Sequence, residues 1–498
     1  MKNYEYVAPS QTTVDKIVSS LCPECLKVVQ AHVFSENDKV FMEKTCPEHG
    51  YFKDIYWSDA SLYMRFNRFW SNGQGLENSL PGNSSCPYDC GICENHLTGT
   101  LLGIIDLTGE CNMACPVCFA DAGQGSFQPT LEQVESMMLN LRKEKPVSCP
   151  AVQFSGGEPT LREDLPEIVA MAKAMGFAQI QIATNGLRLA SSLQLCQALR
   201  KSGLNTVYLQ FDGVTAEPYM AVRGRDYLPV KLKVLDNLRA SGQASVVLVP
   251  TLARGVNDSQ VGDIIRFAAQ NLDLVRGVNF QPVSFAGRIA YEERAKKRIT
   301  IPDLLRLIEE QTEGEIARED FYPVPVVVPI SQLLEAESSS PQPVFAVHPC
   351  CGAATYVYSC SGHMIPITRF IDVEGLLERI KREVESFDGS SLGKLKMKGM
   401  ILKELPKFID EDKAPKDLKV AKMLISVFRN GTRESLTEFH SKTLFLGSMH
   451  FQDAYNMDLE RLRRCGVHYA TPDGRIIPFC SYNTLHRQAV EDRFSIPS

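Results

Sequence analysis

The sequence lacks three features that would place it in specialised classes of protein. It has no excess of positive charge, since its 498 residues carry a formal net charge of −6, and this argues against nucleic-acid binding. It contains no apolar run of about 18 or more residues, so no membrane-spanning helix is predicted. Its N-terminus does not show the order of basic, apolar and small residues that marks a signal peptide. We therefore expect a cytoplasmic protein.

Cysteine, in contrast, is abundant. The chain has 16 cysteines, and most of them lie in tight clusters. In a chain without a secretory signal, this pattern favours metal ligation over disulfides. The remaining composition, 44% apolar and 22% charged, is that of a globular protein, and the length allows about two to four domains.

The most informative cluster is Cys111-Asn-Met-Ala-Cys115-Pro-Val-Cys118. Three cysteines at these spacings suit three corners of one cubane iron–sulfur cluster, whereas an electron-transfer cluster is held by four thiolates. One iron would then stay open for chemistry. The alternative is a zinc knuckle or a chance match. The context argues against it, because a buried strand precedes the cysteines and Thr130-Leu-Glu-Gln133 predicts a capped helix after them.

Residues 100–290 alternate strand-like and helix-like patterns, which predicts an α/β fold with a parallel sheet. Glycine directly after an amphipathic run, at Gly176 and Gly203, predicts two helix ends. Six strands are too few for a closed eight-stranded barrel, so we expect an open, curved (β/α)6 partial barrel with its active site at the carboxyl ends of the strands. The expected strands are Leu101–Thr108, Ala151–Phe154, Gln179–Ala183, Thr206–Gln210, Ser245–Pro250 and Gly277–Gln281.

Cysteine-rich segments flank this predicted core. We therefore expect three regions, residues 1–99, 100–340 and 345–498. Residues 336–343, rich in Ser and Pro, have the composition of a linker between the second and third regions.

The cysteine spacing, followed by a strand and Ser155-Gly-Gly-Glu-Pro159, resembles the radical S-adenosylmethionine (SAM) enzymes. The resemblance implies the partial-barrel fold and a [4Fe-4S] cluster on Cys111, Cys115 and Cys118 as the catalytic centre. In that family the open iron binds SAM, and one electron cleaves SAM to a 5′-deoxyadenosyl radical that abstracts hydrogen. The resemblance also implies that Gly156, Gly157, Glu158 and Pro159 bind the methionine part of SAM.

Other residues at the strand ends are weaker candidates for SAM contacts. Asp212 or its neighbours are expected to bond the ribose hydroxyls, and Arg223 or Arg225 to pair with the SAM carboxylate, while the resemblance places Phe119 near the adenine. For each strand-end residue the alternative is an ordinary turn or cap. The expected contacts are Phe119, Asn185, Asp212, Arg223 and Thr251.

The N-terminal region carries two knuckles, Cys22-Pro-Glu-Cys25 and Cys46-Pro-Glu-His49. Paired knuckles direct their ligands toward one tetrahedral ion. Three cysteines and one histidine favour zinc, and the resemblance adds a rubredoxin-like iron as the alternative.

Eight further cysteines are enough for two auxiliary four-thiolate [4Fe-4S] clusters. The first three repeat the spacing of the main cluster without a following GGEP element, and the last two resemble the hairpin of auxiliary-cluster (SPASM-like) domains. Cys149 and Cys196 are left over, and Cys196 is expected in the core. The eight are Cys86, Cys90, Cys93, Cys350, Cys351, Cys360, Cys465 and Cys480.

Over most of its length the chain is most similar to an archaeal branch that contains tetraether lipid synthase and its pterin-methylating relatives. The CPEC, CPEHG and CPYDCGIC segments and residues Gly447–Asp458 carry this similarity. It implies hydrogen abstraction from the terminal methyl groups of isoprenoid chains and formation of a C–C bond between archaeol tails.

Two other readings remain open. A radical SAM C-methyltransferase acting on a dihydropterin-like heterocycle would share every cluster motif, and a multi-cluster electron carrier would need no SAM cradle. A long apolar tunnel would favour the lipid substrate, whereas a compact polar pocket would favour the heterocycle.

The lipid reading also implies partners. Ferredoxin or flavodoxin is the expected reductant. Residues 391–431 carry ten Lys and Arg against five Asp and Glu and suit peripheral contact with the inner face of a membrane, the alternative being a solvated helix pair. A polar patch is expected to contact substrate or a cluster, and its members are Met449, His450, Gln452, Asp453 and Asn456.

Overall fold

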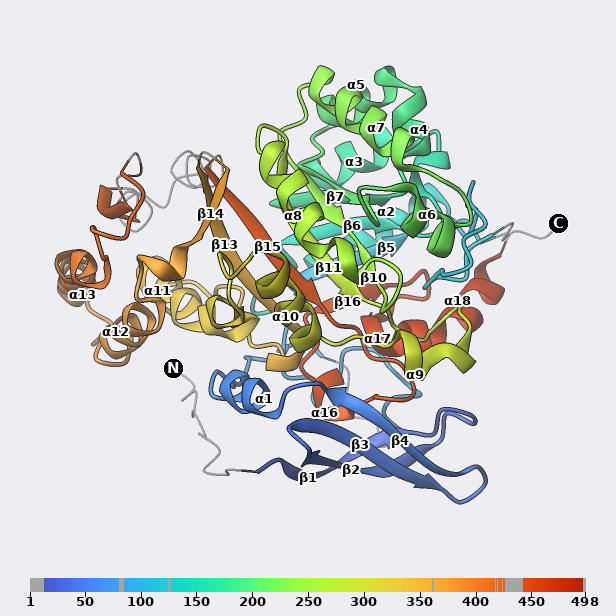
Figure 1. Cartoon of the computed structure of the whole chain (residues 1–498), viewed down its shortest axis with the longest axis horizontal. Coiled ribbons are helices and arrows are strands. Elements are labelled where there is room, and N and C mark those ends of the chain that lie inside the picture. Colours follow the sequence, from blue (N-terminus) through green and yellow to red (C-terminus); the bar gives the residue numbers. More distant parts are fainter. Residues whose placement is uncertain are drawn as a thin grey trace.

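Six parallel strands form the centre of the protein, as the computed structural model shows (Figure 1). Each strand pairs in parallel with the next one along the chain, which confirms the predicted α/β partial barrel. The structure describes residues 13–79, 85–123, 127–360, 362–416, 418, 420–422, 424, 425 and 442–495. The six strands are β5 (Leu102–Asp106), β6 (Ala151–Ser155), β7 (Gln179–Thr184), β8 (Thr206–Gln210), β9 (Val246–Val249) and β11 (Val275–Pro282).

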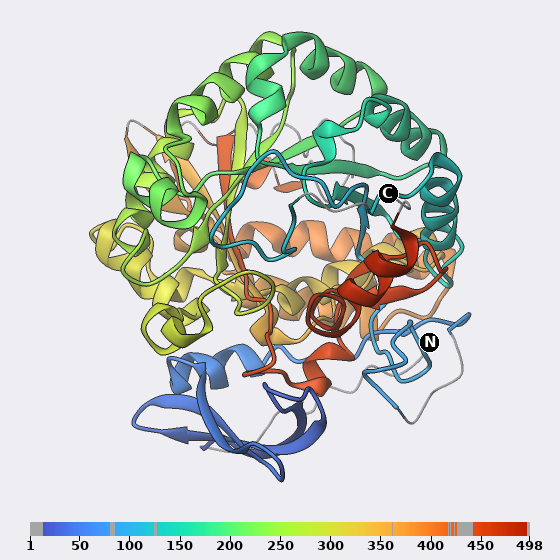
Figure 2. The same cartoon turned by 90° about the vertical axis from the view of Figure 1, so that its right-hand side faces the viewer.

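Helices cover the outer face of this curved sheet (Figure 2). Local sequence sets their ends as predicted: Thr130 and Gln133 form the capping box of α2, and Gly203 ends α5 in the left-handed conformation with φ of 109°. The helices that follow the strands are α2 (Leu131–Arg142), α3 (Leu165–Ala174), α4 (Leu187–Ser191), α5 (Leu193–Ser202), α6 (Ala216–Arg223), α7 (Leu228–Ala240) and α8 (Val261–Gln270). After β11 come α9 (Arg294–Lys297) and α10 (Ile301–Gln311).

The C-terminal region adds one parallel strand to each edge of the partial barrel. Strand β15 (Thr443–Met449) pairs with β11, and β16 (Val467–Ala470) pairs with β5. Residues 450–466 therefore lead from one edge to the other. The region expected at 345–498 thus shares a sheet with the core, because its strands complete edges that the six core strands leave open.

Short strands and helices extend this shared sheet. Strand β13 pairs antiparallel with β15, and β17 pairs antiparallel with β16. The additional strands are β10 (Thr251–Leu252), β12 (Tyr322–Pro323), β13 (Gly352–Cys360), β14 (His363–Pro366) and β17 (Ile476–Pro478), and the C-terminal helices are α16 (Leu459–Leu462), α17 (Phe479–Ser481) and α18 (Arg487–Phe494).

The N-terminal region forms a separate antiparallel sheet at one end of the molecule (Figure 1). It packs on the segment before α16, where Tyr56 donates a buried hydrogen bond to Asp458 at 2.9 Å. Lys16 lies 3.6 Å from the same carboxylate. The elements are β1 (Asp15–Leu21), β2 (Val28–Glu36), β3 (Lys39–Cys46), β4 (Gly50–Trp57) and α1 (Ala60–Asn67).

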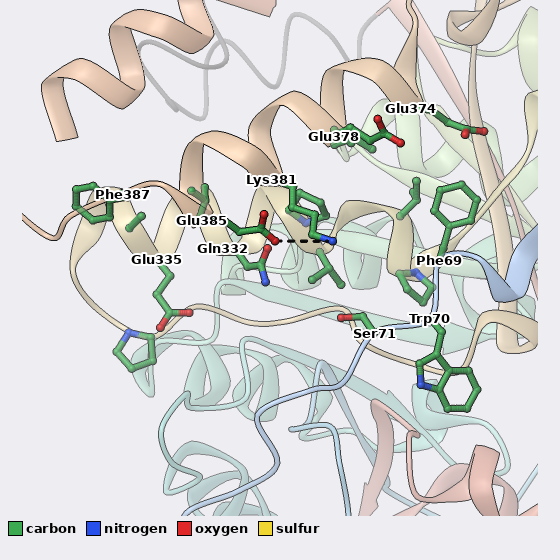
Figure 3. Close-up of a pocket in the computed structure, with 18 of the residues that line it drawn as sticks. Phe69, Trp70, Ser71, Gln332, Glu335, Glu374, Glu378, Lys381, Glu385 and Phe387 are labelled. Carbon is green, nitrogen blue, oxygen red and sulfur yellow. Dashed lines mark ion pairs between the residues drawn. The ribbon is translucent and has the colours of Figure 1, made fainter. Parts of the chain in front are cut away.

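Helices α11 (Val328–Ser338), α12 (Val373–Glu385) and α13 (Ser391–Glu404) form a smaller apolar core beside the sheet. The expected linker at 336–343 begins inside α11, which ends only at Ser338. A groove of about 910 Å³ lies between α11, α12 and residues 68–71 (Figure 3). It is the largest cavity described here, but its lining contains none of the cysteines.

The basic stretch 391–431 is only partly described, since residues 417, 419, 423 and 426–431 lie outside the described residues. In its described part, Leu392 and Leu395 of α13 are 77% and 71% exposed. Among the described residues, no helix combines the length and the apolar character needed to cross a membrane.

Candidate active site and metal centres

The three cysteines of the CxxxCxxC motif lie in the loop after β5, and one arginine holds that loop in shape. Cys118 and Arg288 exchange two backbone hydrogen bonds of 2.9 Å. The Arg288 side chain donates to the carbonyl oxygens of Cys115 at 2.8 Å and Ala122 at 2.7 Å. The loop is therefore fixed from the chain that follows β11, on the far side of the barrel. Nothing in the sequence pattern singled out this arginine.

Gly287, next to that arginine, allows the close approach. Its φ is +67°, and a Cβ atom there would collide with the carbonyl oxygens of Cys118 and Phe119. Any larger residue would push the loop away.

The glycines of the GGEP element pack against the same loop. A Cβ atom on Gly156 would collide with Thr108 and one on Gly157 with Glu110. The Gly157 N–H donates to the Thr108 carbonyl oxygen at 2.7 Å, and the Glu158 N–H donates to that of Glu110 at 2.8 Å. The two glycines were expected to let the backbone approach a ligand. In the structure they also let the GGEP backbone approach the cysteine loop.

Glu158 is 1% exposed, and its carboxylate is hydrogen-bonded to protein groups. It accepts hydrogen bonds of 2.7 Å from the Thr184 hydroxyl and from the Asn185 backbone. The carboxylate joins the end of β6 to the end of β7. Pro159 follows it and begins a short 3-10 turn. Asn185 in turn donates to the Asn112 side chain at 2.8 Å and so reaches the cysteine loop.

Asp212 and Arg223 form a buried pair. Asp212 is fully buried and accepts from Arg223 at 2.8 Å and 2.9 Å and from the Thr251 backbone at 3.1 Å. Arg223 also donates to the Val117 carbonyl oxygen in the cysteine loop at 2.9 Å. Both carboxylate oxygens of Asp212 therefore accept hydrogen bonds from the protein, whereas the sequence led us to expect hydrogen bonds to the ribose hydroxyls of SAM. Arg223 and Thr251 face the cavity described next.

A cavity of about 290 Å³ opens at the carboxyl ends of the barrel strands. Polar side chains from the barrel interior line part of it, among them Gln153, Tyr208, Gln210 and Gln281. Of the predicted site residues, it brings together Cys111, Cys115, Cys118, Phe119, Gly156, Gly157, Glu158, Asn185, Arg223 and Thr251. The cavity is compact and partly polar.

Four aromatic rings form one side of this cavity, and we call them the aromatic wall: Phe119, Phe451, Tyr469 and Phe479. Phe479 stacks on Phe451 with ring centroids 3.9 Å apart, and it lies 5.3 Å from Phe119 and from Tyr469. Sequence reasoning singled out only Phe119. The other three come from the C-terminal segment, whose placement in the barrel no local pattern predicts.

Arg487 also lines the cavity and was missed at the sequence level. It donates to Asp106 at 2.7 Å and to Glu491 at 2.8 Å. Burial raises the pKa of Asp106, and the neighbouring guanidinium opposes that shift. One oxygen of Asp106 has no hydrogen-bond partner among the described residues.

The cysteine thiols of the loop are partly buried. Burial raises the pKa of Cys111 to about 11. It also raises the pKa of Cys115, where Arg223 acts in the opposite direction. At neutral pH the thiols of Cys111 and Cys115 are therefore mainly protonated until a metal binds them. The donor set, three thiols on a loop held by backbone contacts, fits a cubane cluster with one open iron.

The two N-terminal knuckles meet in one site. The distances are 3.8 Å between the Cys25 and Cys46 sulfurs, 3.7 Å from the Cys22 sulfur to His49 Nδ1 and 3.5 Å from the Cys46 sulfur to the same nitrogen. Sulfurs bound at about 2.3 Å to one tetrahedral ion lie roughly 3.8 Å apart. His49 also lowers the pKa of Cys46 to about 6. The four side chains fit a single tetrahedral ion.

The eight other predicted ligands separate into groups. Cys86, Cys90 and Cys93 lie near one another, and burial raises the pKa of Cys90 to about 12 with contributions from both neighbours. A second group, Cys351, Cys465 and Cys480, is described below. Cys350 and Cys360 join neither group in this arrangement. The leftover Cys149 and Cys196 are buried in the main apolar core.

The profile of the radical SAM superfamily matches residues 105–268, and that of the "HMPTM N-terminal zinc ribbon domain" matches residues 14–58. The 7,8-dihydro-6-hydroxymethylpterin dimethyltransferase of Methanocaldococcus jannaschii is 50% identical over 490 residues, which cover 97% of this chain and 96% of that protein. The chain belongs to the radical SAM superfamily and to the family of that enzyme. It is therefore a radical SAM enzyme with a [4Fe-4S] cluster, SAM and an N-terminal zinc ribbon.

More distant relatives share only the core. The GTP 3′,8-cyclase of Stenotrophomonas maltophilia is 30% identical over 177 residues, 35% of this chain and 51% of that protein. The crystal structure of Streptococcus suis SuiB with its precursor peptide SuiA matches with 18% identity and a TM-score of 0.34, over 44% of this chain and 47% of that one.

The comparisons correct the expected position within the superfamily. The relative that matches almost the whole chain is named for a pterin, whereas the sequence reading favoured a lipid synthase. The two readings share all cysteine motifs, so the motifs alone did not separate them.

Replacing Cys115 tests the central cluster. We expect Cys115→Ala to abolish cleavage of SAM, since two thiolates do not hold a cubane, while the zinc-ribbon ion stays bound. The measurement is 5′-deoxyadenosine formed from SAM and dithionite, with total metal content beside it. SAM cleavage at the wild-type rate would contradict the assignment.

A pair of glycine variants tests the packing of the cysteine loop. Gly287 and Gly255 both have positive φ, +67° and +71°, but only Gly287 faces the loop, and Gly255 has open space. Alanine at either position adds backbone strain of about 1 kcal/mol. We expect Gly287→Ala, but not Gly255→Ala, to lose iron from the SAM cluster. The measurement is the iron content of each variant after reconstitution. Equal iron content in both would show that the close contact of Gly287 does not hold the cysteine loop.

The zinc ribbon gives a pH-dependent prediction. The pKa of about 6 belongs to the metal-free Cys46 thiol, and a bound ion competes with protons for the thiolate. We therefore expect acid to release the ion only well below pH 6, and Cys46→Ser to lack it at every pH. Metal content after dialysis at several pH values measures this, with Cys360→Ser as the control that keeps the ion.

Proposed function

We propose that this protein is a radical SAM methyltransferase that replaces hydrogen on a carbon of a dihydropterin-like heterocycle with a methyl group. One SAM, cleaved with one electron from the reductant, supplies the radical that removes the hydrogen, and a second SAM supplies the methyl group, leaves as S-adenosylhomocysteine and takes up one further electron. The observation that carries the proposal is the compact cavity with its aromatic wall, placed directly beside the three cysteines. The full-length similarity to an enzyme named as a pterin dimethyltransferase supports it.

The lining of the cavity favours a small, flat substrate. A stacked ring such as Phe479 binds a planar heterocycle by its face. Gln153 and Gln281 offer hydrogen-bonding groups for the ring edge.

The residues of the site have separable tasks in this proposal. The thiols of Cys111, Cys115 and Cys118 would hold the cluster, which supplies the electron that converts SAM to the deoxyadenosyl radical. Asn185 and the GGEP element would orient SAM, and Arg223 faces the cavity beside Thr251. The aromatic wall excludes water from the side where the substrate ring lies.

Coupling of archaeol tails finds less support. A tail substrate needs a long apolar channel, whereas the cavity at the cysteines carries glutamine, tyrosine and arginine side chains. The large groove at α11 and α12 lies away from the cysteines, and charged side chains such as Glu374, Glu378 and Lys381 line it (Figure 3). We retain ferredoxin or flavodoxin as the proposed reductant.

The direct test compares substrates. Reconstituted protein, dithionite and SAM are incubated without oxygen with 6-hydroxymethyl-7,8-dihydropterin or with archaeol in detergent, and deoxyadenosine and substrate mass are followed together. We expect the pterin to stimulate deoxyadenosine formation and to gain one or two CH2 units. If archaeol but not the pterin stimulated deoxyadenosine formation, the lipid substrate would be favoured instead.

The aromatic wall yields a specific prediction. Phe479→Leu keeps the apolar volume but removes the stacked ring, a loss of about 0.5–1.5 kcal/mol. We expect KM for the pterin to rise up to about tenfold, with kcat less affected. Phe479→Tyr, which keeps the ring, serves as the matched control. An unchanged KM in the leucine variant would show that the ring does not bind substrate.

A further inference from the structure

The end of β15 separates the active-site cavity from a buried cluster of cysteines. Met449 and Phe451 line the cavity. His450 lies between them, and because side chains alternate along an extended chain, it is on the other side of this segment. Its backbone N–H donates to the carbonyl oxygen of Cys351 at 3.0 Å, continuing the β13–β15 ladder by one residue.

That register places His450 opposite Cys351. In the antiparallel pair Gly352 faces Met449, so the next pair outward is Cys351 and His450. Arg461 also joins the two residues, since its guanidinium donates to the His450 carbonyl oxygen at 3.1 Å and lies 3.8 Å from the Cys351 sulfur.

The imidazole of His450 has no partner in the described protein. The residue is 2% exposed, and neither Nδ1 nor Nε2 has a hydrogen bond among the described residues. A buried polar group without a partner is costly and calls for a specific explanation. Three neighbours along the chain, within the described part, also carry unpaired buried atoms: Ser448 Oγ, Asn456 Nδ2 and Arg461 Nε. A polar group that the protein binds would account for all of them.

Three thiols converge on this place. The thiols of Cys351 and Cys480 both contribute to the raised pKa of Cys465, after burial, and Cys351 likewise contributes to that of Cys480. Arg461 lies 3.8 Å from the Cys351 sulfur, and the Gln452 N–H donates to the Cys480 sulfur at 3.3 Å. N–H donors and a guanidinium at the sulfurs are the outer contacts that an anionic iron–sulfur cluster requires.

Two further cysteines are alternatives for the fourth ligand. Cys350 lies beside Arg461 and Cys351 as well as Lys16 and Asp458, but it is not among the main groups that shift the pKa of Cys465 or Cys480. Cys360 is the last of the nine residues of β13, which puts it about 30 Å from Cys351 at roughly 3.3 Å per residue. Neither is placed to complete the group.

We propose that Cys351, Cys465, Cys480 and His450 together hold one auxiliary [4Fe-4S] cluster, one side-chain layer behind the aromatic wall. The proposal does not depend on the identity of the substrate. A neutral imidazole in place of a thiolate removes one negative charge from the cluster, which raises its reduction potential. This cluster would accept an electron more readily than a four-thiolate cluster in the same position.

The test reads the ligand directly. Protein labelled with 15N-histidine is prepared in a Cys111→Ala, Cys115→Ala, Cys118→Ala background, which removes the SAM cluster signal. Electron–nuclear double resonance of the reduced protein should then show 15N coupling from a ligand nitrogen. This protein keeps its natural His450. If it is folded and loaded with iron but shows no 15N coupling, the proposal is wrong.

Variants complete the test. His450→Cys should keep the iron, lose the 15N coupling and shift the reduction potential to lower values, whereas His450→Ala should lose the iron of one cluster. Cys360→Ser is the control and should retain both iron and coupling. A coupling that persists in His450→Cys, or loss of the cluster in Cys360→Ser, would refute the ligand set.

Discussion

The site depends on strand pairing at the two edges of an open barrel. Six βα units leave both edges of their sheet unpaired, and unpaired backbone groups are satisfied only by a further strand, a side chain or water. Strands β15 and β16 of the C-terminal region provide those pairings, with β11 and with β5. The chain between them is consequently held across the barrel opening, and it carries Phe451, the Arg461 guanidinium and Cys465 into the interior. The pairing of β15 and β16 with the barrel edges therefore positions both the aromatic wall and the group of Cys351, Cys465 and Cys480.

Close backbone contacts then set the geometry of the cysteine loop. Glycines at 156, 157 and 287 let three chain segments meet at distances that a Cβ atom would prevent. Arg288 and Arg223 reinforce the loop through its carbonyl oxygens. A cluster that binds SAM at one iron needs three fixed thiolates and one open side, and a loop anchored by its backbone leaves the side chains free for that purpose.

Much of the core was predictable because its signals are local. Alternating patterns, the Thr130 capping box and Gly203 specify the strands and helices, and the spacing of Cys111, Cys115 and Cys118 specifies the cluster type. The zinc ribbon was equally readable from its two knuckles. Long-range pairing was not readable: Phe479 and Arg487 look like ordinary core and surface residues until β16 and β17 bring them to the cavity. The sequence also offered Asp212 as a ligand contact, although its partner proved to be Arg223, eleven residues further on.

The central claim is that a small flat ring binds between the aromatic wall and the SAM cluster. A crystal structure of the anaerobically reconstituted protein with SAM and 6-hydroxymethyl-7,8-dihydropterin tests it most directly. The account predicts density for the pterin lying parallel to Phe479, with its ring edge toward the glutamines of the barrel interior. A pterin bound elsewhere, or a cavity that opens into a long apolar channel once the clusters are in place, would contradict it.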